Sequence, residues 1–114
     1  MPSEFGREPS FVEEDVERRS HVRGPVRDLF AELPGGVRTP VLEAGTRGVF
    51  VAVDEPDTYA LGAGLEVRIQ GALGTVSAKV EVIRKEIHPR RGIALLIVHI
   101  APAAEATYLS FLRE

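Results

Sequence analysis

Arginine is the side chain of this sequence with the most versatile binding chemistry, and three arginines gather near its start. Arg18, Arg19 and Arg23 lie within residues 17–23, and Arg19 and Arg23 are four positions apart. A guanidinium group can hold phosphate oxygens or the O6 and N7 atoms of guanine bidentately, and it can stack flat on a purine ring. Two such groups on one loop could straddle a ligand that carries phosphates and guanine bases. The same arginines, next to several glutamates, could instead form local ion pairs worth under about 1 kcal/mol each.

A second candidate cluster, Glu43 to Gly48, stands directly before the apolar run 49–53. The carboxylate of Glu43 could accept hydrogen bonds from the N1 and N2 donors of guanine. Gly45 brings no side chain, and Gly48 allows the backbone to approach a ligand closely or to adopt an unusual φ angle. Whether the two clusters form one site depends on whether the fold brings them to one surface.

The composition limits the other functions of this chain. A length of 114 residues fits one domain with one core, and the absence of cysteine excludes disulfides and thiolate metal sites. The net charge of −3 argues against a protein that grips polymeric nucleic acid through many phosphates. No apolar run approaches the roughly 20 residues that cross a bilayer, and the first residues lack the apolar stretch of a secretory signal. We therefore expect a cytoplasmic protein without membrane insertion.

The remaining polar residues do not suggest a catalytic or metal site. His21, His88 and His99 have no partner at metal-ligand spacing, and no Ser-His-Asp arrangement or nucleophile elbow is present. We expect no enzymatic activity, no metal and no cofactor. The charged residues at 84–86 and 89–91 are predicted to cap a hairpin in solvent.

The hydrophobic pattern predicts a set of short strands after a tail. Residues 1–16 mix acidic residues with Pro, Gly and Ser, which predicts a mobile acidic tail before a domain at 17–114. A bend is expected at residues 24–25 and a turn at 34–36. The predicted strands are 26–33, 37–42, 48–53, 65–70, 76–82 and 93–100. The run 48–53 is apolar on both faces, so it should be covered on both sides, whereas 65–70 and 76–82 alternate and should have one wet face.

The last residues predict a short amphipathic helix. Pro102 suits the first turn, and Ala104, Tyr108, Phe111 and Leu112 fall on one helical face. About six strands separated by turn glycines, followed by this helix, favour a small closed or nearly closed antiparallel barrel. The last three strands should form a meander.

The two clusters resemble the two-part ligand site of PilZ domains, whose usual ligand is the bacterial second messenger cyclic di-GMP. That family holds the ligand with an Arg-x-x-x-Arg loop and an Asp/Asn-x-Ser-x-x-Gly strand start. The resemblance runs from residue 17 to the C-terminus and includes Leu61-Gly62 and Arg91-Gly92-Ile93-Ala94. It implies an all-β fold, a six-stranded antiparallel PilZ-type β-barrel with a C-terminal helix. The implied cyclic di-GMP site consists of Arg18, Arg19, Arg23, Glu43, Gly45 and Gly48.

The sequence departs from the family pattern in the second motif and in the last strand. Glu43 replaces Asp or Asn, and Gly45 replaces Ser. Leu96 and Ile97 stand where relatives often carry Arg and Phe. The first departure keeps a carboxylate, but the second removes a hydroxyl that contacts the ligand in the family.

Three functions follow as hypotheses. The first is a cyclic di-GMP receptor or adaptor, which changes conformation on binding and regulates an unidentified protein partner in motility, pilus, biofilm or polysaccharide control. The second is a degenerate PilZ module that no longer binds the nucleotide and acts through protein contact. The third, a barrel that binds RNA or single-stranded DNA, would need aromatic residues on a basic face, which the acidic composition disfavours.

Overall fold

The structure is a computed structural model, and it describes residues 24–113. The elements in this part are β1 (Gly24–Pro25), β2 (Phe30–Leu33), β3 (Val37–Ala44), β4 (Gly48–Ala52), the 3₁₀ turn η1 (Pro56–Thr58), β5 (Gly64–Gly71), β6 (Gly74–Glu86), β7 (Gly92–Ile100) and the helix α2 (Pro102–Phe111). The predicted tail and its boundary at residue 17 lie outside the described residues.

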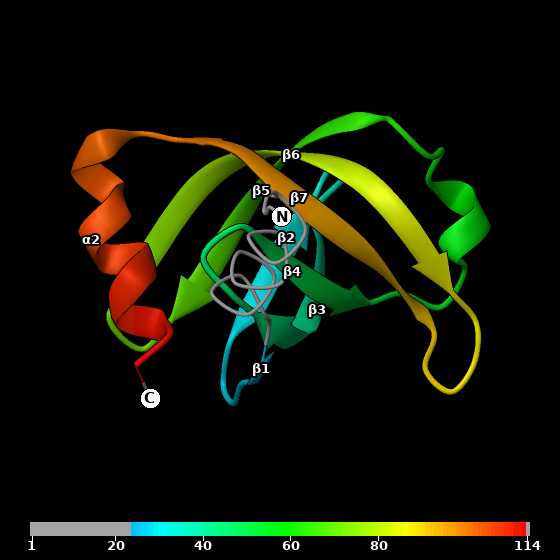
Figure 1. Ribbon diagram of the computed structural model, residues 1–114, viewed down its shortest axis with the longest axis horizontal. Coiled ribbons are helices and arrows are strands. Elements are labelled where there is room, and N and C mark those ends of the chain that lie inside the picture. The colour runs from blue at the N-terminus through cyan, green and yellow to red at the C-terminus, as the bar shows by residue number, and fades with distance from the viewer. Residues whose placement is uncertain (1–23, 114) are drawn as a thin grey trace, which may run out of the picture.

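The strands close into an antiparallel barrel (Figure 1). Their hydrogen-bonded order is β1-β3-β2-β5-β6-β7-β4, and β4 pairs in turn with β3. The short β1 pairs with the end of β3, and β2 pairs with its beginning. Because β1 and β2 follow each other along one edge of β3, they act as two parts of one interrupted strand. The predicted six-stranded PilZ-type barrel with a C-terminal helix is therefore confirmed.

The first predicted strand, 26–33, is wrong over its first half. Asp28 has a φ angle of 58°, in the left-handed region, which interrupts the extended backbone. The pairing resumes at Phe30, opposite Pro40. The bend expected at Gly24–Pro25 is instead a two-residue strand, since these residues pair with Ala44 and Glu43.

The strands β5, β6 and β7 form the predicted meander, and β5 and β6 follow the predicted alternation. Val67 and Ile69 of β5 and Val76, Ala78 and Val80 of β6 are buried in the core, and the single residues that separate them along each strand are exposed. Side chains on alternate faces of a strand separate interior from surface, so one face of this meander is wet. The turn between β2 and β3 also matches, because Gly35 and Gly36 have the positive φ angles that a tight turn requires.

Helix α2 covers one end of the barrel, and the β6–β7 hairpin lies at the other end (Figure 1). Pro102 opens the helix, as predicted, and Tyr108 and Phe111 are its buried residues. The Phe111 ring fits over Gly71, where an added Cβ would lie only 2.8 Å from it. The rings of Tyr108 and Phe111 meet edge to face, with centroids 6.3 Å apart. No helix in the described residues is long and apolar enough to span a membrane.

Candidate functional site

Phe50 is a buried aromatic residue on the outer wall of the barrel. Its neighbours in β4, Val49 and Val51, belong to the core, so Phe50 points to the opposite face. Its partners across the strands, Glu43 in β3 and Ala94 in β7, share that face. Phe50 nevertheless has 0% of its surface exposed. Something outside the barrel therefore covers it, and the prediction of a strand covered on both sides is confirmed.

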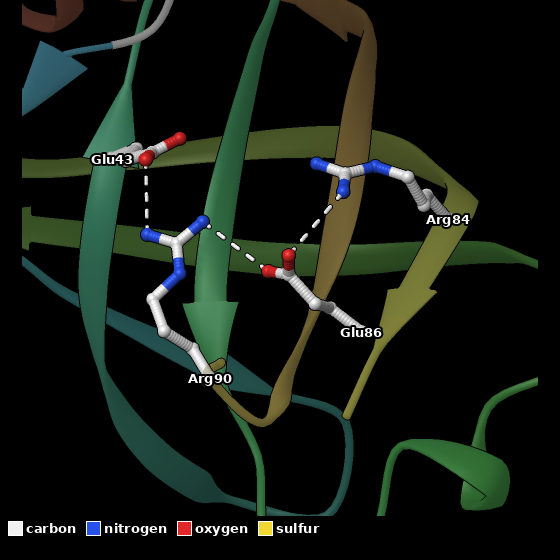
Figure 2. Close-up of polar contacts among 4 residues, drawn as sticks. All are labelled: Glu43, Arg84, Glu86 and Arg90. Atoms are coloured by element: carbon white, nitrogen blue, oxygen red, sulfur yellow. Dashed lines mark hydrogen bonds and ion pairs between the residues drawn. The ribbon is translucent and has the colours of Figure 1, made fainter. Parts of the chain in front are cut away.

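The cover is the guanidinium group of Arg90, which comes from the loop between β6 and β7. Its central carbon lies 4.2 Å from the centroid of the Phe50 ring, which is cation–π distance. One of its nitrogens donates to Oε2 of Glu43 at 2.9 Å, and another donates to Oε1 of Glu86 at 3.3 Å (Figure 2). The guanidinium thus bridges two carboxylates while it lies against an aromatic ring.

Charges of alternating sign continue along this surface. Glu86 also pairs with Arg84, whose nitrogen is 3.8 Å from Oε2 of Glu86 (Figure 2). The pKa of Arg90 is raised: burial lowers it, but the hydrogen bond and charge of Glu43, followed by those of Glu86, raise it by more. Arg90 is therefore a permanent cation. We call Glu43, Phe50, Glu86, Arg84 and Arg90 the outer-wall cluster.

The outer-wall cluster corrects one sequence prediction. The charged residues at 84–86 and 89–91 were expected to cap a hairpin in solvent, but the side chains of Arg90 and Glu86 are only 34% and 18% exposed. The flat guanidinium has an aromatic ring to cover, and this favours packing over solvation. Arg91 is closer to the expectation, since it is exposed and donates to the carbonyl of Asp54 at 3.2 Å.

The second sequence cluster, Glu43 to Gly48, forms the end of β3, a tight turn and the start of β4. The N–H of Gly45 donates to the carbonyl of Gly48 at 2.9 Å, which closes the turn. Gly48 pairs with Leu96 of β7, and it is not among the glycines with a positive φ angle. We expected a glycine at position 48 either to adopt an unusual φ angle or to let another group approach the backbone closely. The structure excludes the unusual φ angle, so close approach is the role that remains.

A buried hydrogen bond joins this turn to the C-terminal helix. The hydroxyl of Tyr108 donates to the carbonyl oxygen of Gly45 at 2.5 Å. Gly45 and Tyr108 are both buried, and burial raises the pKa of Tyr108. The position where the family has a serine is thus held by its backbone from inside the molecule.

The first sequence cluster, with Arg18, Arg19 and Arg23, lies outside the described residues. The described chain starts beside the second cluster, because Gly24 pairs with Ala44 and Pro25 pairs with Glu43. The segment that carries the arginines therefore joins the barrel at the second cluster. This is the arrangement that a two-part site requires of the chain.

The sequence named Glu43 and Gly45 as candidates, but it did not indicate that Arg90 lies on Glu43 and Phe50, or that Tyr108 contacts Gly45. The apolar run 48–53 indicated that the outer face of β4 is covered, yet it carried no signal for what covers it. Arg90 is 47 positions from Glu43, and Tyr108 is 63 positions from Gly45. No local pattern links residues at such separations.

The closed barrel with its terminal helix places this chain among proteins with a PilZ-like fold. No family model matches the sequence, and no curated protein matches it either. Among solved structures, the chain is similar to the Bacillus subtilis inhibitor of motility (MotI/DgrA), with a TM-score of 0.68 and 17% sequence identity. The match covers 84% of this chain and 49% of that protein, so the chain spans about half of its length. At this identity the likeness shows a shared fold.

Proposed function

We propose that this chain is a PilZ-type adaptor that binds cyclic di-GMP and thereby regulates a protein partner in motility, pilus, biofilm or polysaccharide control. It acts by binding and conformational change, without catalysis. The observation that carries the proposal is the pairing of Gly24 and Pro25 with Ala44 and Glu43, which leads the arginine segment into the barrel beside the second cluster. The similarity to an inhibitor of motility supports a regulatory role.

The residues of both clusters have complementary tasks in this proposal. Arg18, Arg19 and Arg23 hold the phosphates and stack on the guanines, because only the guanidinium group offers both contacts. Glu43 accepts hydrogen bonds from the guanine edge, and Gly48 allows close approach. Binding fixes the arginine segment against the barrel wall, which changes the surface that a partner meets.

Calorimetric titration with cyclic di-GMP tests the proposal on the native chain and on Arg23→Ala. We expect the native chain to bind and Arg23→Ala to lose affinity by on the order of a hundredfold, since an arginine contact to a charged group is worth roughly 1.5–3 kcal/mol. Arg38→Ala is the matched control, because Arg38 lies at the other end of β3 from Glu43, packs over Phe30 and donates to Gln70 at 2.8 Å. Equal affinity of both variants would contradict the assigned role of Arg23.

A second candidate function is a PilZ-like module that acts by protein contact and binds no nucleotide. The specific observation in its favour is that the motif positions are engaged internally: Arg90 binds Glu43, and Tyr108 binds the carbonyl of Gly45. This function predicts no heat of binding from the native chain at tens of micromolar cyclic di-GMP. The same titration therefore decides between the two functions.

A further inference from the structure

Phe50 forms an aromatic surface on the outer wall of the barrel, which is bordered by a glycine and covered by a movable side chain. Gly92 lies against the ring, because a Cβ added there would be 2.7 Å from it. The nearer cover of the ring is Arg90, whose loop between Glu86 and Gly92 belongs to neither strand, and the guanidinium of Arg84 lies farther away, 5.9 Å from the ring centroid. The aromatic surface is fixed in the sheet, whereas its cover is a long side chain on a loop.

The contacts of Arg90 are those that a guanine base would make at the same place. A guanidinium group and the N1–C2–N2 edge of guanine share one planar fragment with adjacent N–H donors, and in Arg90 one of these donors contacts Glu43 while another contacts Glu86. Arg90 directs such a donor to Glu43 at 2.9 Å and lies against Phe50 at 4.2 Å. A purine would stack on the same ring, since aromatic side chains accept bases in this way. Adenine lacks the adjacent donors of guanine, so Glu43 would discriminate against it.

We propose that Arg90 is an internal guanine mimic, which occupies a base-binding place on Phe50 and leaves it when a guanine nucleotide enters. This inference rests on the proposed function and adds to it the regulation of the site. Glu86 holds the other side of the guanidinium at 3.3 Å and can keep Arg90 nearby after its release from Glu43. The free chain is then closed by its own side chain, and the ligand must compete with it.

The strength of this closure allows displacement. The Arg90 side chain is 34% exposed, so its ion pairs are partly screened and its release does not strand a deeply buried charge. A protein whose competent state is only a fraction of the population binds with affinity reduced by that fraction. Removal of the mimic should therefore raise the affinity for cyclic di-GMP, by about tenfold if one molecule in ten is open.

The test compares Arg90→Ala with Arg91→Ala, which removes the same charge from the neighbouring exposed position. Calorimetry with cyclic di-GMP should show binding about tenfold tighter for Arg90→Ala than for Arg91→Ala. Cyclic di-AMP should bind more weakly than cyclic di-GMP to both variants. Equal or weaker binding of cyclic di-GMP by Arg90→Ala would overturn the mimic and leave the proposed function standing. If neither variant nor the native chain binds, both proposals fall.

A measurement on the native chain keeps the inference testable if Arg90→Ala does not fold. Nitrogen-15 NMR of the arginine side chains reports on Arg90 directly, because the Phe50 ring current shifts the Nε–H signal of a guanidinium that lies on it. Saturation with cyclic di-GMP should move this signal to the position of a solvated arginine. A signal that keeps its ring-current shift in the saturated protein would overturn the displacement.

Discussion

The hydroxyl of Tyr108 joins α2 to the turn between β3 and β4 through a hydrogen bond. It donates to the carbonyl of Gly45, and both residues are buried. A buried carbonyl that loses its donor is costly, because no water replaces the bond. This contact therefore links the end of the molecule under the helix with the strand that carries Glu43.

Tyr108→Phe removes this bond and keeps the ring. We expect the free energy of unfolding to fall by about 1–3 kcal/mol, the cost of leaving the Gly45 carbonyl unsatisfied. Urea denaturation at neutral pH measures the change. A variant as stable as the native chain would show that the hydroxyl contributes nothing net.

The Tyr108 hydroxyl should also make the stability of the folded chain depend on pH. Burial raises the pKa of Tyr108 above its ordinary value of 10.0, so the folded chain keeps a proton that the unfolded chain loses. The stabilisation by the hydroxyl is fully present below about pH 10 and declines as the pH rises further, by up to about 1.4 kcal/mol per unit. The stability difference between the native chain and Tyr108→Phe should therefore shrink between pH 8 and about pH 11. A difference that stays constant or grows would contradict this assignment.

At the scale of elements, the contact of β4 with β7 depends on glycine at the start of β7. A Cβ at Gly92 would collide with the carbonyl of Val51 and lie 2.7 Å from the Phe50 ring. Gly64 offers a comparison, because it also begins a strand, but the nearest atom to its added Cβ is 3.9 Å away.

Gly92→Ala should accordingly destabilise the barrel by about 1–3 kcal/mol, as overpacking does, whereas Gly64→Ala should change stability by under about 1 kcal/mol. Thermal unfolding of both variants, followed by circular dichroism, makes the comparison. Similar midpoints for the two would mean that β4 and β7 adjust to the added methyl group.

Some strand boundaries were predicted correctly from the sequence pattern and others were not. Alternation over 65–70 and 76–82 is local and strong, and β5 and β6 follow it. The predicted strand at 26–33 was wrong at its start because one residue, Asp28, adopts a positive φ angle. An aspartate can adopt a positive φ angle but does not require one, so the sequence alone does not predict the interruption of the strand.

At the scale of the whole molecule, barrel and helix depend on each other. The pairing of β3 with β4 closes the ring of hydrogen-bonded strands, and α2 covers one end of the barrel (Figure 1). Phe111 is a buried apolar residue of this helix, with only 4% of its surface exposed, whereas Leu109 on the same helix is 37% exposed.

Phe111→Ala should therefore lower the free energy of unfolding by about 3–5 kcal/mol through loss of burial and the cavity that remains. Leu109→Ala should change it by about 0.5 kcal/mol or less, since an exposed position contributes little packing. Chemical denaturation of the two variants shows whether α2 contributes to the stability of the barrel or is only loosely attached to it. Equal losses in the pair would favour the loosely attached helix.

Local pattern was sufficient for the barrel class and for the terminal helix, because strand alternation, turn glycines and helical spacing are properties of neighbouring residues, whereas Glu43 as a site residue stays a prediction. Only the folded chain brings Arg90 onto Phe50 and Glu43, and Tyr108 onto Gly45. These contacts join segments about half the chain apart, and their geometry depends on strand register, closure and the space above Gly92. Such quantities are set by packing in three dimensions, and no local pattern contains them.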